Sequence, residues 1–159
     1  MYQEEFPYQI RWAAAEDWTP AMNMIWKTFM KFEAPVYTRE GIRNFLDFIT
    51  DEGLFASFLE GKYLMIVALD GNRIIGAASL RDGSHLSLLF VDEQYHYRGI
   101  GRRLMNCLCN FLKTEAGEEV MTLKSAPYAV KFYERIGFCA TGLEESYSGI
   151  RVTPMRKVL

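Results

Sequence analysis

Two glycines stand at the start of a helix-like segment, with the spacing of an anion-binding loop. Gly99 and Gly101 follow Arg98, after the apolar residues 88–91 and before a segment with helical periodicity. Glycine lets the backbone approach a ligand closely, and the first N–H groups of a helix, with the positive end of its dipole, favour an anion. This stretch therefore predicts a backbone site for a phosphate or pyrophosphate group.

Two common nucleotide-binding loops do not fit the sequence around these glycines. A dinucleotide-binding loop needs a third glycine at position 104, where this chain has Leu104. A nucleoside-triphosphate loop needs Gly-Lys followed by Ser or Thr, and the loop does not continue in that way. The strand before the loop also closes a predicted antiparallel meander, which is not how a dinucleotide-binding half begins.

Three predicted strands lead into the glycine loop and one follows it. Apolar runs at 63–69, 74–80 and 85–91 are separated by Asp-Gly turns, which predicts an antiparallel meander. The next segment repeats apolar residues every three or four positions and ends at Gly117. A helix there would join the strand at 85–91 to a short strand at 120–123, so we expect these two strands to be parallel. Ligands favour the carboxyl ends of such strands, where the loop lies.

The other elements follow from periodicity and capping residues. They are a strand at 8–12, a helix at 20–32, a helix capped by Thr38 and ending near Ile49, a helix from Ser125 to Ile136, and strands at 138–141 and 152–158. No repeat, linker or low-complexity segment interrupts them. We therefore expect one α/β domain over residues 1–159 with a mixed sheet.

Charge and hydropathy exclude several classes of partner. The net charge is −2 with both signs interspersed, so no basic block indicates nucleic acid and no polybasic helix indicates an anionic membrane. The longest apolar run, Tyr63–Leu69, is too short to span a bilayer, and residues 1–5 are acidic where a secretion signal would be basic. We expect a cytoplasmic protein with a small-molecule partner.

The three cysteines predict neither a disulfide framework nor a metal site. Cys107, Cys109 and Cys139 form no Cys-x-x-Cys pair and no metal-ligand pattern with the two histidines. Cys107 falls on the apolar stripe of its predicted helix, so we expect buried or inert thiols rather than catalytic ones.

Two separate segments carry a family resemblance. One is Leu89-Phe90-Val91 followed, after six residues, by Arg98-Gly99-Ile100-Gly101, and the other is Phe132-Tyr133-Glu134-Arg135-Ile136-Gly137-Phe138. They resemble the two signature segments of the GNAT superfamily of N-acetyltransferases, and the order of predicted elements is similar to that family over nearly the whole chain. In the family the loop reads Arg or Gln, two residues, Gly, one residue, then Gly or Ala. Here His96 stands at the first of these positions.

The resemblance implies a fold and a ligand. The fold would be a single α/β (α+β) domain with a mixed, mostly antiparallel sheet, a central parallel pair splayed to hold acyl-CoA, and helices on both faces. Acetyl-CoA would be the acyl donor, with its pyrophosphate on loop N–H groups and its pantetheine arm along the strand at 88–91. An N–H at Phe90 or Val91 would polarise the acyl carbonyl. Since the backbone makes most pyrophosphate contacts, we expect His96 to tune affinity rather than abolish it. The residues implied for CoA binding are Leu89, Phe90, Val91, His96, Tyr97, Arg98, Gly99, Ile100, Gly101, Arg102, Ser125, Tyr128 and Phe132.

The resemblance also implies a catalytic role for Tyr133. In family members a tyrosine at this place protonates the departing CoA thiolate, and a phenol has a suitable pKa for that step. Packing against the sheet is the alternative role for this side chain. The group that takes the amine proton stays open: His85 at the start of the central strand and Glu33 after the first helix are candidates, and some family members use only a water chain.

The acceptor and one alternative function also stay open. A small amine, an amino acid or a peptide N-terminus would each fit an aromatic lining with little charge. The residues expected to form this lining are Trp26, Phe29, Phe32, Glu33, Tyr37 and Tyr147. The alternative function is a non-catalytic acyl-CoA sensor, because a fold and a binding loop do not by themselves prove chemistry. We also expect that a homodimer can form through a sheet edge or the first two helices.

Overall fold

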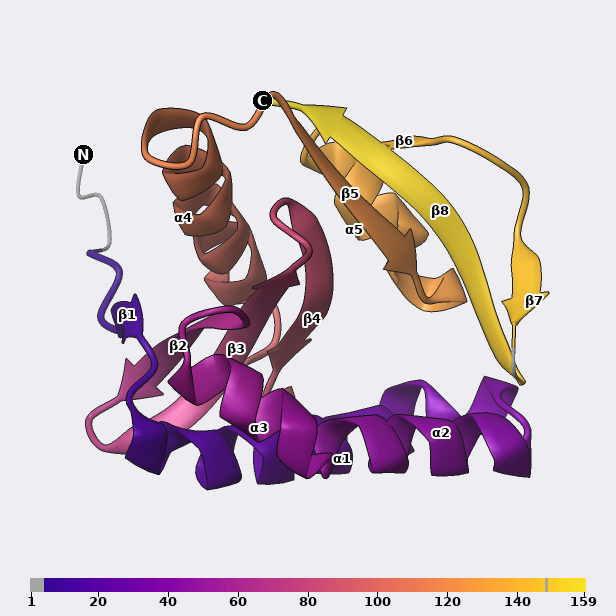
Figure 1. Ribbon diagram of the computed structural model, residues 1–159, viewed down its shortest axis with the longest axis horizontal. Helices are drawn as coiled ribbons and strands as arrows, with labels where there is room; N and C mark the ends of the chain where they lie inside the picture. The colour runs from indigo at the N-terminus through magenta and orange to yellow at the C-terminus, as the bar shows by residue number, and fades with distance from the viewer. Residues whose placement is uncertain (1–4, 148) are drawn as a thin grey trace.

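The protein folds into a mixed sheet with helices on both faces (Figure 1). The computed structural model describes residues 5–147 and 149–159. Residues 1–4 lie outside this range, and they include most of the acidic N-terminal segment that speaks against a secretion signal. The side chain of Tyr147, a predicted lining residue, is also outside the description. The strands are β1 (Gln9–Trp12), β2 (Leu64–Asp70), β3 (Arg73–Arg81), β4 (His85–Val91), β5 (Val120–Ser125), β6 (Cys139–Ala140), β7 (Glu145–Tyr147) and β8 (Ile150–Val158). The α-helices are α1 (Trp18–Phe32), α2 (Arg39–Ile49), α3 (Glu52–Leu59), α4 (Ile100–Thr114) and α5 (Val130–Arg135). Short 3-10 turns are η1 (Ala15–Asp17), η2 (Ala34–Val36), η3 (Glu93–Tyr95) and η4 (Pro127–Ala129).

The sheet has the order β1-β2-β3-β4-β5-β8-β6, with β7 paired to β8. All of these neighbours are antiparallel except β4 and β5, which are parallel and joined through α4. The prediction of a mixed, mostly antiparallel sheet with one central parallel pair is therefore confirmed.

The parallel pair β4 and β5 touches at one end only. Its register pairs His85 with Thr122, and the Thr122 N–H donates to the Ser84 carbonyl over 3.1 Å. From there the two strands diverge toward the layer of α1 and α2 (Figure 1). On its outer side β5 stays paired with β8 along its whole length. The carboxyl halves of β4 and β5 therefore face each other across a gap in the sheet, as the resemblance implied.

A β-bulge lies in β4 where this divergence begins. Ser79 of β3 pairs with Leu88 and its neighbour Leu80 pairs with Leu86, so Ser87 is an extra residue. In consequence Leu86 packs in the core under α4, whereas Leu88 and Phe90 pack in the core under α1 and α2. The bulge therefore changes which side chains β4 presents to each face.

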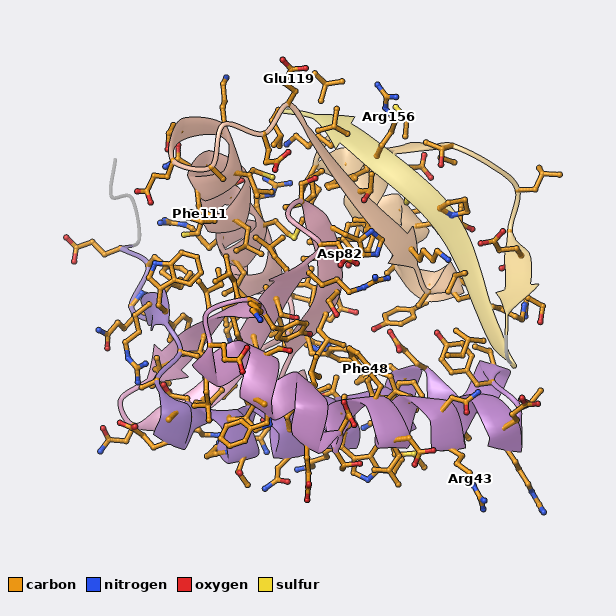
Figure 2. All side chains as sticks on the ribbon, in the orientation of Figure 1. Arg43, Phe48, Asp82, Phe111, Glu119 and Arg156 are labelled. Atoms are coloured by element: carbon orange, nitrogen blue, oxygen red, sulfur yellow. The ribbon has the colours of Figure 1, made fainter. Side chains whose placement is uncertain are left out.

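The helices lie in two layers, each with its apolar face on the sheet. Helix α2 begins with the predicted cap, since the Thr38 hydroxyl accepts the Gly41 N–H over 3.1 Å. Figure 2 shows Phe48 directed from α2 toward the sheet and Arg43 directed away from it. This segregation follows the helical period of apolar residues in the sequence.

Two features of the helices differ from the sequence prediction. Helix α3 was missed, although Asp51 caps it by accepting the Leu54 N–H over 3.0 Å. The helix predicted from Ser125 begins later, because Ser125 is the last residue of β5, opposite Thr153, and α5 starts only at Val130. The Ser125 hydroxyl donates to the Ala126 carbonyl over 2.8 Å instead of capping a helix.

The prediction that Cys107 lies on the apolar stripe of its helix was wrong. The stripe of α4 that faces the sheet runs through Ile100, Leu104, Leu108 and Leu112, and Cys107 lies beside it on the exposed surface. Cys139 is also exposed, whereas Cys109 is half-buried and burial raises the pKa of its thiol.

Candidate functional site

The glycine loop forms the start of α4 as the sequence predicts. Gly99 is the N-cap residue with a φ of +79°, a left-handed conformation that favours glycine. The first helical hydrogen bond runs from the Arg103 N–H to the Gly99 carbonyl over 3.0 Å, so the N–H groups of the three residues between them point out of the helix end. A Cβ at Gly99 would meet no protein atom within 4 Å. The backbone here is open to an anionic ligand.

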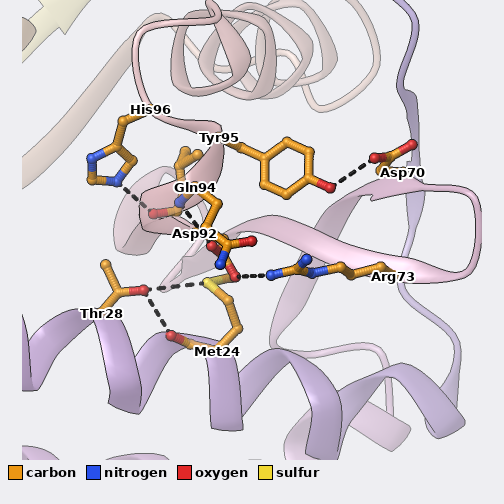
Figure 3. A network of polar contacts seen from close by, with 9 residues as sticks. Met24, Thr28, Asp70, Arg73, Asp92, Gln94, Tyr95 and His96 are labelled. Carbon is orange, nitrogen blue, oxygen red and sulfur yellow. Dashed lines mark hydrogen bonds and ion pairs between the residues drawn. The ribbon is translucent and has the colours of Figure 1, made fainter.

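The side chain of His96 bonds to the end of β4. Its Nε2 lies 2.7 Å from the Val91 carbonyl oxygen (Figure 3), and because a carbonyl can only accept, Nε2 carries the proton. The imidazole ring also lies 5.1 Å from the ring of Phe32 at the end of α1. His96 therefore links the loop to the strand that precedes it and to the helix layer.

Polar contacts also hold Arg98 and the start of the loop. The Arg98 guanidinium donates to the Tyr8 hydroxyl over 2.8 Å and lies over the ring of Tyr95, whose hydroxyl donates to Asp70 over 2.7 Å. Figure 3 shows this Tyr95–Asp70 bond beside the pair of Arg73 and Asp92. The Arg98 side chain is thus held by protein groups on the β1 side.

A cavity of about 170 Å³ lies between the diverging halves of β4 and β5. Backbone and side chains of Ser87–Phe90 form one wall, and Leu123 and Lys124 of β5 form the opposite one. Four polar side chains also line the cavity: Glu33 at the end of α1, Tyr37 directly after η2, Tyr128 in η4 and Tyr133 in α5. The cavity therefore brings together two of the three predicted catalytic residues, Glu33 and Tyr133, with Leu89, Phe90 and Tyr128 of the predicted CoA site.

One carboxyl group and three phenols share this cavity. Burial raises the pKa of Glu33 from its usual 4.5 to about 7. Burial and the nearby charge of Glu33 raise the pKa of Tyr37, Tyr128 and Tyr133 above the usual phenol value. At neutral pH the site thus holds a carboxyl group close to half ionisation among protonated phenols.

Aromatic neighbours fix the position of Tyr133. Its ring packs edge-on against Phe132 at 5.2 Å and Phe138 at 5.6 Å, and the side chain is only 7% exposed. Phe132 in turn lies against the start of α4, where a Cβ at Gly101 would come within 3.3 Å of the ring. The second glycine of the loop therefore makes room for the residue that precedes Tyr133.

His85, the third predicted catalytic residue, lies at the closed end of the β4–β5 pair. Its Nδ1 is 2.8 Å from the Thr122 hydroxyl, and it is not among the residues that line the cavity. Burial, with the positive charges of Arg81 and Lys124, lowers the pKa of His85. The structure thus separates His85 from Glu33 and Tyr133.

Only part of the predicted aromatic lining reaches the cavity. Glu33 and Tyr37 line it, whereas Phe29 is fully buried in the core and Trp26 stacks on it. Phe32 lies between His96 and Tyr128. The sequence interpretation missed lining residues that reach the cavity only through the packing of α2, β4, β5 and β8, among them Phe45, Ser87, Lys124, Ile150 and Val152. Of these, only Ser87 gave a signal, as a polar residue inside an apolar run.

Sequence comparisons point to one family. Residues 33–159 match the family model described as "Acetyltransferase (GNAT) domain". The chain is 30% identical over 83 residues to N-alpha-acetyltransferase 30 of Schizosaccharomyces pombe, which covers 46% of this chain and 55% of that protein. It is 26% identical over 138 residues to an uncharacterized N-acetyltransferase of Methanocaldococcus jannaschii, over 82% of this chain and 60% of that protein. The chain thus spans little more than half the length of these two relatives.

Structural comparisons give the same fold. A GCN5-related N-acetyltransferase from Rhodopseudomonas palustris superposes over the whole of both chains with a TM-score of 0.83 and 23% identity. The PaiA N-acetyltransferase from Thermoplasma acidophilum, solved with coenzyme A, has a TM-score of 0.79 and 18% identity, over 96% of this chain and 99% of that one.

Within residues 5–147 and 149–159, no helix is long and apolar enough to cross a membrane and no three His, Cys, Asp or Glu residues form a metal-binding group.

Proposed function

The chain belongs to the GNAT family of acetyltransferases, and on that basis we propose that residues 1–159 act as one domain that transfers an acetyl group from acetyl-CoA to a primary amine. The observation that carries the proposal is that Glu33 and Tyr133 meet in one cavity beside the open edge of β4. A group that can take a proton and a group that can give one are thus present where the strands diverge.

The residues of the loop and of β4 fit acetyl-CoA. The N–H groups of Ile100, Gly101 and Arg102 suit the pyrophosphate, because they lie at a helix N-terminus and the left-handed Gly99 leaves the approach open. The edge of Leu89–Val91 that faces the gap suits the amides of the pantetheine arm, as in strand addition by a peptide. When bound, acetyl-CoA supplies an activated thioester carbonyl to the cavity.

Glu33 is the residue we propose to receive the amine proton. It lies in the cavity wall with a pKa of about 7, so its carboxylate can both attract an ammonium group and accept a proton from it. The rings of Tyr37 and Tyr128 beside it offer aromatic faces to the same cation. We favour Glu33 over His85 because His85 lies outside the cavity.

Tyr133 is the residue we propose to protonate the departing thiolate. Its raised pKa keeps the phenol protonated at neutral pH. The negative charge of Glu33 contributes to that raised pKa, and the charge disappears when Glu33 takes the amine proton. Proton uptake at Glu33 therefore makes Tyr133 a stronger acid at the moment when an acid is needed.

The test is release of the CoA thiol from acetyl-CoA with a panel of primary amines, in wild type and Tyr133→Phe. We expect release with at least one amine, and a kcat lower by about 10²-fold in the variant with an unchanged Kd for CoA in calorimetry. Equal kcat in the two proteins would remove Tyr133 from its role. Binding of acetyl-CoA without release on any amine would favour the alternative function, an acyl-CoA sensor.

The panel should include small amines, amino acids and peptides with a free N-terminus. The relative named N-alpha-acetyltransferase 30 gives a reason to include the peptides. The expected homodimer is also a proposal, and sedimentation of the purified protein over a range of concentrations tests it.

A further inference from the structure

Three hydroxyl groups form a chain from the core to the cavity wall. The Tyr63 hydroxyl lies 2.7 Å from the Ser79 hydroxyl and 2.9 Å from that of Ser87. Tyr63 is 3% exposed and Ser79 is fully buried, whereas Ser87 lines the cavity. Glu33 and Tyr133, the groups of the proposed mechanism, belong to other elements and take no part in this chain.

The direction of the hydrogen bonds follows from the number of protons. A phenol has one proton, and Tyr63 donates it to Ser87. The Ser79 hydroxyl must then donate to Tyr63, because Tyr63 has no second proton for it. Ser87 accepts from Tyr63 and keeps its own proton, which is therefore available to an acceptor in the cavity. Burial raises the pKa of Tyr63, which keeps this donor protonated.

The β-bulge determines where Ser87 lies. Ser87 is the extra residue between Leu86 and Leu88, immediately beyond the point where β4 and β5 separate. Bulges re-aim a side chain and interrupt strand pairing. As a result, the same residue can reach Tyr63 in the core and line the cavity between the strands.

Packing alone does not require these hydroxyls. Phenylalanine and alanine would fill nearly the same volume as Tyr63 and Ser79, and they would bury no polar group. A hydroxyl that accepts one hydrogen bond becomes a better donor of its own, especially at low local dielectric. The chain thus strengthens Ser87 as a donor toward an oxygen atom that gains negative charge.

We propose that Ser87 is a further catalytic residue, whose hydroxyl donates to the thioester carbonyl oxygen, and that Tyr63 and Ser79 are its positioning residues. This inference rests on the proposed acetyl transfer. The C–N bond forms as the amine attacks the carbonyl carbon, and the carbonyl electron pair moves to the oxygen, where Ser87 stabilises it without giving up its proton. When that pair returns, the C–S bond breaks, the thiolate takes the Tyr133 proton, and the amine proton is on Glu33.

The test compares kcat and the Kd for CoA in variants of the three residues. Ser87→Ala should lower kcat by about 10²-fold and leave the Kd for CoA unchanged. Ser87→Thr, which keeps a hydroxyl, should recover part of the loss. Tyr63→Phe should lower kcat by less, and Ser79→Ala by less still. The double variant Ser87→Ala with Tyr63→Phe should be no slower than Ser87→Ala alone, because Tyr63 acts through Ser87.

Thr28→Val is the matched control, since it removes a buried hydroxyl that donates only within α1, to the Met24 backbone carbonyl and sulfur. It should leave kcat unchanged. If Ser87→Ala has the kcat of wild type, or if its lower activity is explained by weaker binding of CoA, then Ser87 is not catalytic. The proposed acetyl transfer is not affected by either result. If Tyr63→Phe slows the Ser87→Ala protein further, the positioning role fails. If wild type releases no CoA with any amine, the proposed function fails and this inference fails with it.

Discussion

Glu33 shows how one half-buried carboxyl group sets a pH requirement for the whole site. It is the C-cap residue of α1, and its side chain lines the cavity that also holds Tyr133. Burial raises its pKa to about 7, because water no longer stabilises the charged form. The group therefore changes charge within the physiological range, where an unperturbed carboxylate would stay ionised.

We predict that kcat/KM rises with pH through about 7 as Glu33 loses its proton. In Glu33→Gln this limb of the profile should disappear and the plateau should fall, because the amide can neither accept a proton nor attract an ammonium group. The measurement is kcat/KM between pH 5.5 and 9 with the best amine of the panel. Persistence of the limb in Glu33→Gln would assign it to another group, with His85→Gln as the next variant to compare.

Glu33→Gln should raise the stability of the folded chain at high pH, although it lowers activity. The pKa of Glu33 is higher in the folded chain than its usual 4.5, so the folded state binds more protons, and stability falls as pH rises from about 4.5 through 7. Glu33→Gln removes this loss. The variant should therefore melt at a higher temperature than wild type at pH 8, and the difference should shrink at pH 5. An unchanged difference across this range would show that the carboxyl group is not buried in solution.

The site residues differ in how far the sequence could predict them. The glycines and Tyr133 belong to short motifs, so a local pattern was enough to select them. Glu33 could be named only as one of two candidates, because Glu33 and Tyr133 lie 100 positions apart in the chain and come to one cavity only in the folded sheet. Ser87 could be noticed only as a polar residue inside an apolar run, because its proposed role depends on a bulge and on Tyr63, a partner 24 residues earlier.

At the scale of elements, the start of α4 has two separate requirements at Gly99. Its φ of +79° disfavours any side chain, and its open surroundings let a ligand approach. Gly117 beyond the other end of the same helix has a φ of +69° and is equally open. The two positions share the backbone strain, and only Gly99 lies at the anion-binding end.

We predict that Gly99→Val and Gly117→Val lose similar stability, about 1–2 kcal/mol each, whereas only Gly99→Val loses affinity for CoA. The loss should be at least about tenfold, because a branched side chain blocks the approach to the backbone N–H groups. Thermal melts and calorimetric titration with CoA measure the two effects. Wild-type affinity in Gly99→Val would show that the pyrophosphate binds elsewhere.

Elements with a clear period were predicted well, and those defined by tertiary contacts were not. The strand at 85–91 was predicted with its observed bounds, because its apolar run lies between a turn and the loop. Helix α3 has only eight residues, too few for a clear period. At Ser125 a capping signal competed with strand pairing, and the six-residue register of β5 on β8 prevailed.

At the scale of the molecule, two contacts far apart in the sequence hold the walls of the cavity in place. At one end the two halves of the sheet join through the pairing of His85 with Thr122. At the other end Gly149, directly before β8, contacts the start of α2, where the Thr38 N–H donates to the Gly149 carbonyl over 3.2 Å. Ile150 follows directly and lines the cavity. The contact at Gly149 therefore positions one wall of the site.

Gly41 makes this second contact possible and gives a test of it. A Cβ at Gly41 would clash with the Gly149 carbonyl oxygen and lie 3.3 Å from the Ile150 side chain, so Gly41→Ala must push Gly149 and Ile150 away from α2. We predict a several-fold higher KM for the amine and an unchanged Kd for CoA, because Gly149 and Ile150 are not among the residues proposed to hold CoA. The stability cost should be about 1–3 kcal/mol.

Gly53→Ala is the control, because it makes the same substitution in α3, where the added Cβ would meet only the Asp51 side chain at 3.1 Å. The same carboxylate oxygen caps α3 by accepting the Leu54 N–H, so its displacement weakens the cap, whereas alanine itself favours a helix. These two effects oppose each other, so the net stability change should stay below about 1 kcal/mol and the amine KM should be unchanged. Steady-state kinetics over a range of amine concentrations, with saturating acetyl-CoA, separates the two variants. An amine KM that stays at the wild-type value in Gly41→Ala, in a protein with the expected loss of stability, would show that the acceptor does not touch the β8 wall. The acceptor would then be held by the α1 and α5 side of the cavity alone, which places its recognition on Glu33, Tyr128 and Tyr133.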